Sequence, residues 1–134
     1  MFPLGDSPGP PGSTLAPFAP RFPFETWVLP VGHRSSYEET GPEEFLPLAR
    51  VLGDVLRRLG RVLDDPPYNL MLHSAPLRAP HLDHFHWHLE IITKFIRVAG
   101  FEWGTGFFIN PTPPEEAARY LRGEGHNSAL LPQS

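Results

Sequence analysis

Histidine is the residue type with the clearest capacity for chemistry in this sequence. Five of the seven histidines lie between residues 73 and 88, at His73, His81, His84, His86 and His88. Three of them, His84, His86 and His88, alternate with apolar residues and are followed by Glu90. Alternate side chains of a β-strand share one face and are about 6.5–7 Å apart, so two imidazoles can converge on one ion. Imidazole and carboxylate ligands suit zinc or iron(II).

The remaining ligands of such a site would come from other elements. The candidates are His33, at the exit of a predicted strand, His73, on another predicted strand, and Glu90. A second interpretation is nucleophilic, because imidazole attacks phosphorus and leaves it again readily. A third is a solvated sheet face that binds nothing. The residues alone leave these three interpretations open.

The composition excludes several functions. The sequence has no cysteine, which excludes disulfides, thiolate zinc sites and cysteine nucleophiles. Its formal net charge is −4 and no stripe of Lys and Arg is present, so we expect no nucleic-acid partner. No apolar run approaches the ~18–20 residues of a membrane span, and no basic segment precedes an apolar one at the start. We therefore expect no membrane partner and a cytoplasmic protein.

Proline and glycine divide the 134-residue chain unevenly. Seven of the 18 prolines and three of the 12 glycines fall in residues 1–23. Proline lacks an N–H donor and favours extended geometry in the residue before it, so we expect neither a helix nor a central strand there. The sequence predicts a flexible lead-in over residues 1–20, one domain over 21–125 and a tail over 126–134.

One long helix and one short helix are predicted. Apolar residues recur in steps of three and four from Phe45, at Leu48, Leu52, Val55, Leu59 and Val62. Thr40 and Glu43 resemble a capping box for this helix, and residues 64–67 (DDPP) end it. A second helix is expected from Thr112, as its N-cap, through Pro113 at the first helical position to about Arg122.

Strands account for most of the other regular structure. Residues 24–30, 69–73 and 84–92 are predicted as strands, residues 76–80 as a loop, and the glycine-rich residues 100–110 as a strand or hairpin. In the 84–92 strand, Phe85, Trp87, Leu89 and Ile91 would face the core, with the histidines and Glu90 opposite. This order of elements predicts an α+β fold with an antiparallel sheet.

Several segments occur in an order that resembles the C-terminal half of the galactose-1-phosphate uridylyltransferase family, within the histidine-triad-like superfamily. The segments are FPFETW (22–27), LP followed by His33 (29–33), PYN (67–69), HWHLE (86–90), GFEWGTG through IN (100–110) and PEEAA (114–118). The resemblance covers about residues 17–122. It implies a histidine-triad-like antiparallel sheet with one long and one short helix packed on it.

The resemblance also implies ligands. Some relatives hold a metal with a cysteine pair and histidines at the positions of His33 and His86. Others use histidines matching His73 and His88, a residue at the position of Glu90, and a Glu from the other half. Because the cysteine pair is absent, the resemblance favours His73, His88 and Glu90, with His33 and His86 as the alternative. Contacts to the sugar nucleotide are implied at Arg97, Phe101, Glu102, Gly106 and Asn110.

The implied function is that of half an enzyme. The family transfers a nucleoside monophosphate between a sugar nucleotide and a hexose 1-phosphate through a nucleotidylated His in the first half, which this sequence lacks. The chain would supply metal and sugar-phosphate contacts, with the N-terminal half as partner, or would form a homodimer. One alternative is a stand-alone histidine-triad nucleotide hydrolase or transferase with His86 as nucleophile. Another is a non-catalytic metal-binding module.

Overall fold

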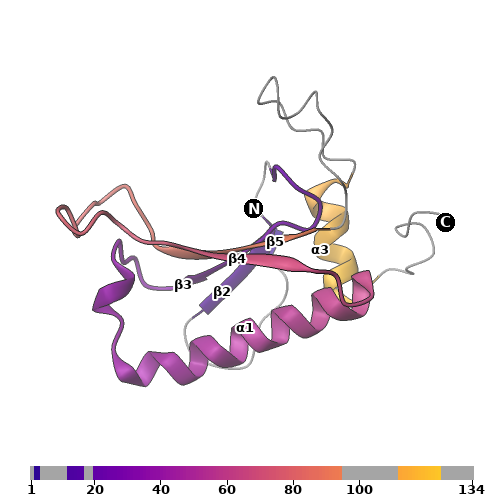
Figure 1. Ribbon diagram of the computed structural model, residues 1–134, viewed down its shortest axis with the longest axis horizontal. Helices are drawn as coiled ribbons and strands as arrows, with labels where there is room; N and C mark the ends of the chain where they lie inside the picture. Colours follow the sequence, from indigo (N-terminus) through magenta and orange to yellow (C-terminus); the bar gives the residue numbers. More distant parts are fainter. Residues whose placement is uncertain (1, 4–11, 17–19, 95–111, 125–134) are drawn as a thin grey trace.

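The structure, a computed structural model, describes residues 2–3, 12–16, 20–94 and 112–124 (Figure 1). Its five strands are β1 (Phe2–Pro3), β2 (Gly12–Ala16), β3 (Thr26–Pro30), β4 (Tyr68–His73) and β5 (His88–Thr93). They form one sheet in the order β1-β2-β3-β5-β4, and every neighbouring pair is antiparallel. The helices are α1 (Pro42–Leu63) and α3 (Pro114–Arg122), with a short 3-10 turn, η1, at Tyr37–Glu39. The expected α+β class is confirmed.

The core lies between the sheet and the two helices. Val28 of β3 and Leu89 and Ile91 of β5 pack in one buried cluster with residues of α1 and α3. The helical members of the cluster are Val51, Val55, Leu59, Leu63, Ala117, Ala118 and Leu121. Trp87 is buried and Phe85 is partly buried against the same cluster, as their alternation predicts. Because successive side chains of a strand point to opposite faces, His88 and Glu90 lie on the other face of the sheet.

Helix α1 begins one capping position later than expected. Its N-cap is Gly41, whose N–H donates to Glu44 Oε2 at 3.0 Å, while the Glu44 N–H donates to the Gly41 carbonyl at 3.0 Å. The predicted box of Thr40 and Glu43 is therefore wrong by one residue. The helix ends as expected, with Asp64 in the left-handed conformation.

Helix α3 shows a similar offset. It begins at Pro114, with Pro113 rather than Thr112 at the N-cap, and it ends at Arg122, followed by the C-cap Gly123 with a φ of 85°. Glycine has no Cβ, so this left-handed C-cap costs it little.

The expectation of no central strand in the lead-in is wrong. Strand β2 lies between β1 and β3, and Leu15 pairs with Trp27. Residues 12–16 (GSTLA) contain no proline, so their N–H groups are available to a ladder on either side. Proline content averaged over residues 1–23 concealed this short segment.

The predicted strand at residues 84–92 is wrong in its first half. Strand β5 begins at His88, which pairs with His73, the last residue of β4, and on its other side its pairing with β3 ends at Val28 and Leu89. The Trp87 N–H donates instead to the Arg34 carbonyl at 2.9 Å, and His84 lies in a turn. The other predicted strands, at 24–30 and 69–73, match β3 and β4 closely. The predicted strand or hairpin at 100–110 lies outside the described residues.

Neither α1 nor α3 has an apolar stretch of the length and hydropathy that crossing a bilayer requires, as far as the described residues extend.

Candidate functional site

Glu90 is the buried centre of the polar face of the sheet. It is 2% exposed, and its two carboxylate oxygens have different partners. Oε2 lies 2.6 Å from His73 Nε2, and Oε1 accepts a hydrogen bond of 3.0 Å from Arg21 Nη2. The strand register explains the first contact, because His73 lies opposite His88 and therefore diagonally across from Glu90.

His73, His88 and Glu90 form a compact group of potential ligands. One ligand atom from each residue can be chosen so that all three atoms lie within 4.8 Å of one another. The two imidazoles are stacked, with ring centroids 4.7 Å apart. His88 Nδ1 lies 3.0 Å from the His86 carbonyl, a contact that favours the tautomer with its lone pair on Nε2. The group can therefore hold a metal ion.

Trp27 and Glu25 form a supporting layer behind this group. The Trp27 indole stacks on His88 with ring centroids 4.5 Å apart, and its Nε1–H donates to Glu25 Oε1 at 3.1 Å. Glu25 is 3% exposed, and its Oε2 also accepts a hydrogen bond of 2.7 Å from the backbone N–H of Arg21. Arg21 thus contacts both buried carboxylates, through its backbone at Glu25 and through its side chain at Glu90. Sequence reasoning gave none of these three residues a role at the site.

The two buried carboxylates differ in protonation tendency. Burial raises the pKa of Glu25, against the opposing hydrogen bonds from Arg21 and Trp27. Burial acts in the same direction on Glu90, but hydrogen bonds from Arg21 and His73 outweigh it and leave the pKa of Glu90 below its usual value. Glu90 is therefore the carboxylate that favours the charged form, which suits a cation ligand.

The alternative pair, His33 and His86, also lies together. Their rings meet edge to face with centroids 5.2 Å apart. His33 is exposed, while His86 Nε2 is buried and has no hydrogen-bond partner among the residues that the structure describes. Burial and then the neighbouring His33 lower the pKa of His86, so its imidazole favours the neutral form. Within residues 20–94 and 112–124, no third ligating residue completes a group around this pair.

The other predicted residues divide into two sets. His84 and His81 are exposed and lie apart from the group, and His81 Nδ1 is 3.5 Å from Glu39 Oε1. The expected sugar-nucleotide contacts lie outside the described residues: Arg97, Phe101, Glu102, Gly106 and Asn110.

The fold places the chain in a structural class. A zinc-bound histidine triad family protein from Mycobacterium smegmatis superposes with a TM-score of 0.62 at 21% identity, over 91% of this chain and 81% of that one. At that identity the likeness concerns the fold, which is histidine-triad-like. No protein-family model matches the sequence.

Two curated relatives are more similar in sequence. An ADP-glucose phosphorylase from Arabidopsis thaliana is 39% identical over 111 residues, covering 81% of this chain and 32% of the relative. A crystal structure of an ADP-glucose phosphorylase from Arabidopsis thaliana with bound ADP-glucose has a TM-score of 0.84 at 36% identity, over 90% of this chain and 39% of that one. A galactose-1-phosphate uridylyltransferase from Thermotoga maritima is 39% identical over 116 residues, covering 81% of this chain and 36% of the relative.

These similarities confirm the resemblance seen in the sequence: the chain is a homologue of galactose-1-phosphate uridylyltransferases and of their relative ADP-glucose phosphorylase. It spans about a third of the length of the curated relatives that it matches. One relative is an ADP-glucose phosphorylase and the other a uridylyltransferase, and this chain is similar to part of each.

Proposed function

We propose that this chain is the C-terminal domain of a hexose-1-phosphate uridylyltransferase-like enzyme of hexose metabolism. The whole enzyme would move a nucleoside monophosphate between a sugar nucleotide and a hexose 1-phosphate. The nucleotidylated His would lie in an N-terminal half outside this sequence. The chain itself would contribute metal and sugar-phosphate contacts, the latter from Arg97, Phe101, Glu102, Gly106 and Asn110.

The observation that carries the proposal is the group formed by His73, His88 and Glu90. Zinc binds imidazole nitrogens and carboxylate oxygens at about 2.0–2.2 Å, and three donor atoms within 4.8 Å of one another can close around such an ion by small side-chain rotations. The donor set contains no thiolate, which fits zinc or iron(II). The fourth position would be filled by a carboxylate of the other half or by water. A bound ion would cross-link β4 to β5 and supply positive charge beside a substrate phosphate.

The residues around the group would keep its ligands in place. Arg21 binds one oxygen of Glu90 and leaves the other oxygen facing His73. The Trp27 and His73 rings both stack on the His88 ring. These two contacts restrict rotation of the His88 imidazole. Hydrogen-bond partners around metal ligands orient those ligands in proteins generally.

Strand β4 is the candidate surface for the missing half. Among the described strands it is the last of the sheet, and Tyr68, Leu70 and Leu72 along it are 47%, 44% and 44% exposed. Leu70 pairs with Ile91 and Leu72 with Leu89, so these side chains point to the helical face of the sheet without being covered by a helix. An apolar edge of this kind fits an interface with the other half of the enzyme, or with a second copy of the chain.

The alternative with His86 as a phosphorus nucleophile receives less support. An attacking nitrogen must reach the phosphorus of a substrate, and His86 Nε2 is buried. The neighbouring His84 is exposed in a turn rather than aligned beside His86 on one strand face. The geometry therefore supports a ligand or structural role over a nucleophilic one.

An activity assay separates these functions. The purified chain is mixed with UDP-glucose or ADP-glucose and a hexose 1-phosphate, and separately with a nucleoside phosphoramidate. We expect no nucleotidyl transfer and no release of the monophosphate, because the nucleophile lies in the other half. Transfer by the chain alone would contradict the proposal. Phosphoramidate cleavage that disappears in His86→Ala would establish the stand-alone alternative instead.

A further inference from the structure

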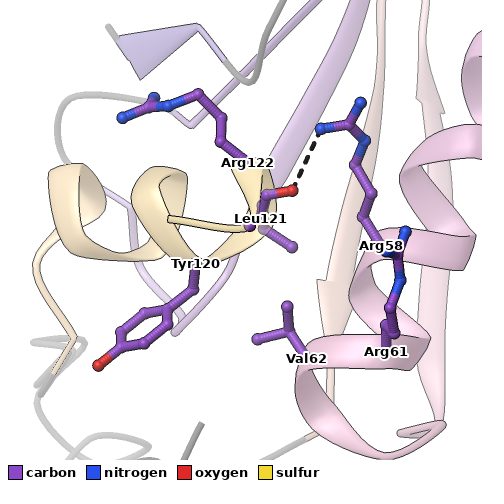
Figure 2. Close-up of a pocket in the computed structure, with 7 residues that line it drawn as sticks. Arg58, Arg61, Val62, Tyr120, Leu121 and Arg122 are labelled. Carbon is purple, nitrogen blue, oxygen red and sulfur yellow. Dashed lines mark hydrogen bonds between the residues drawn. The ribbon is translucent and has the colours of Figure 1, made fainter. Parts of the chain in front are cut away.

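A second polar site lies on the other side of the sheet. A pocket of about 310 Å³ separates the C-terminal ends of α1 and α3. Its lining is Arg58, Arg61, Val62, Tyr120, Leu121, Arg122 and Gly123. Figure 2 shows Arg58, Arg61 and Val62 on α1 and Tyr120, Leu121 and Arg122 on α3. Both helices pack against the face that carries Leu89 and Ile91, so the pocket is separated from His88 and Glu90 by the sheet.

The Arg58 guanidinium is held in position at the pocket wall. Its Nε donates to Asp54 Oδ2 at 2.8 Å. Its Nη1 donates to the Leu121 carbonyl at 3.2 Å, the bond that Figure 2 draws as a dashed line. These two bonds fix the plane of the guanidinium and also tie α1 to α3. A guanidinium oriented before binding loses less conformational entropy when it contacts an anion.

Arg61 and Arg122 add further positive charge. In residues 20–94 and 112–124, no carboxylate lies within salt-bridge distance of the exposed Arg61. Arg122 Nε donates to Glu124 Oε1 at 2.9 Å, but Glu124 is 54% exposed. Exposed ion pairs contribute little stability, so a doubly charged anion can displace Glu124 at low cost.

Arginines in the last turn of a helix are common because they stabilise its C-terminus. That effect explains why Arg61 and Arg122 are favourable at these positions. It does not require a pocket between them, nor the apolar wall formed by Val62 and Leu121. A concave site with charged side chains in its lining and an apolar floor is typical of small-molecule binding, and 310 Å³ is at the small end of the usual range.

We propose that this pocket binds a small phosphate-bearing molecule, independently of the His73, His88 and Glu90 group. A phosphate offers three or more acceptor oxygens in different directions, so it can contact guanidinium groups from both helices at once. A planar carboxylate has two acceptor oxygens and suits a single guanidinium. Occupancy would join the ends of α1 and α3 more firmly and stabilise the fold.

Calorimetric titration of the full chain with inorganic pyrophosphate tests this site. The buffer contains a chelator, so that no divalent cation bridges pyrophosphate to the metal ligands, and an ionic strength of about 0.15 M suppresses unspecific attraction. We expect saturable binding of one equivalent. Arg61→Gln should weaken it about tenfold, since it removes a charge-assisted contact. Glu124→Gln should tighten it, because it removes the competing carboxylate from Arg122.

Two control variants remove one positive and one negative charge from other parts of the same two helices. Arg50→Gln lies three turns before Arg61 on α1, and Glu115→Gln lies in the first turn of α3. Both should leave the affinity within about twofold of the parent. Absence of saturable binding would overturn the proposal, and so would equal weakening by Arg61→Gln and Arg50→Gln. Loss of binding in His73→Ala with no effect of Arg61→Gln would place pyrophosphate at the metal ligands and also overturn it.

Discussion

His73 Nε2 lies 2.6 Å from Glu90 Oε2, although 17 positions separate the two residues in the sequence. The antiparallel pairing of β4 with β5 produces this contact, because His73 and His88 lie opposite each other at the end of the ladder. Glu90 is buried on the polar face of the sheet and His73 is half-buried beside it. A buried carboxylate that meets an imidazole and a guanidinium is the feature on which the proposed metal site depends.

The hydrogen bonds of Glu25 yield a prediction about stability. Glu25→Ala removes the acceptor for the Trp27 indole N–H and for the backbone N–H of Arg21. The two unpaired donors, which are partly buried, should lower the free energy of unfolding by about 1–3 kcal/mol. Urea denaturation measures this loss. The control Glu39→Ala removes an exposed carboxylate and should change stability by less than about 0.5 kcal/mol; equal losses in the two variants would contradict the role given to Glu25.

The core gives a second prediction. Leu59 of α1 is 2% exposed in the cluster that joins both helices to the sheet. Leu59→Ala should lower the free energy of unfolding by about 2–5 kcal/mol, from lost burial and from the cavity that remains. Leu46→Ala, on the same helix but 60% exposed, is the matched control and should cost less than about 1 kcal/mol. Comparable losses would show that the packing of α1 differs from this description.

The N-terminus of α1 predicts a pH dependence. The Gly41 N–H, and then the Arg34 guanidinium, hold the pKa of Glu44 below its usual 4.5. A carboxyl whose pKa is lowered by folding contributes stability that is complete above pH 4.5 and is lost as the pH falls through the folded-state pKa. Glu44→Gln should therefore be less stable than the parent at about pH 7, and this difference should shrink towards pH 3.

Urea unfolding at several pH values measures that difference. Glu43→Gln is the control, because Glu43 lies in the same helical turn but does not accept the Gly41 N–H. The control separates the capping bond from the general attraction between a carboxylate and a helix N-terminus. A difference between Glu44→Gln and the parent that stays constant with pH would argue against the capping bond.

The exposed edge of the sheet predicts self-association in the absence of the other half. Leu70 and Leu72 of β4 are each 44% exposed on the face that α1 packs against. We expect a concentration-dependent increase in mass by sedimentation velocity, and a shift towards monomer in Leu70→Ser with Leu72→Ser. Leu77→Ser removes a leucine that is 81% exposed in a loop and should leave the association unchanged. A parent chain that is monomeric at all concentrations would contradict this prediction.

Local patterns predicted most of the elements. The three- and four-residue steps of apolar side chains located α1, and the aromatic and β-branched residues of 24–30 located β3. These signals depend on neighbours in sequence, so one sequence suffices to read them. The group of His73, His88 and Glu90 was also reached in advance, through resemblance to a family rather than through spacing.

The start of β5 and the residues that support the site depend on long-range pairing, which the sequence did not reveal. The alternation at residues 84–92 continues upstream of His88, but a strand needs a hydrogen-bonded neighbour, and the pairing of β5 ends at His73 of β4 and at Val28 of β3. The support of the site is equally non-local, because Arg21 reaches Glu90 across 69 positions. No periodic pattern marks Arg21, Glu25 or Trp27, and only the order of strands brings them to the same place.

The most direct test of the central claim is the metal content of the purified chain. Metal-free protein is loaded with zinc, or with iron(II) under anaerobic conditions, dialysed, and analysed by mass spectrometry of the elements. We expect about one equivalent in the parent, a loss in His73→Ala and His88→Ala, and retention in His84→Ala, whose residue lies apart from the group. Circular dichroism of each variant verifies that it is folded. A parent chain that retains no metal, or a loss confined to His33→Ala and His86→Ala, would contradict the assignment to His73, His88 and Glu90.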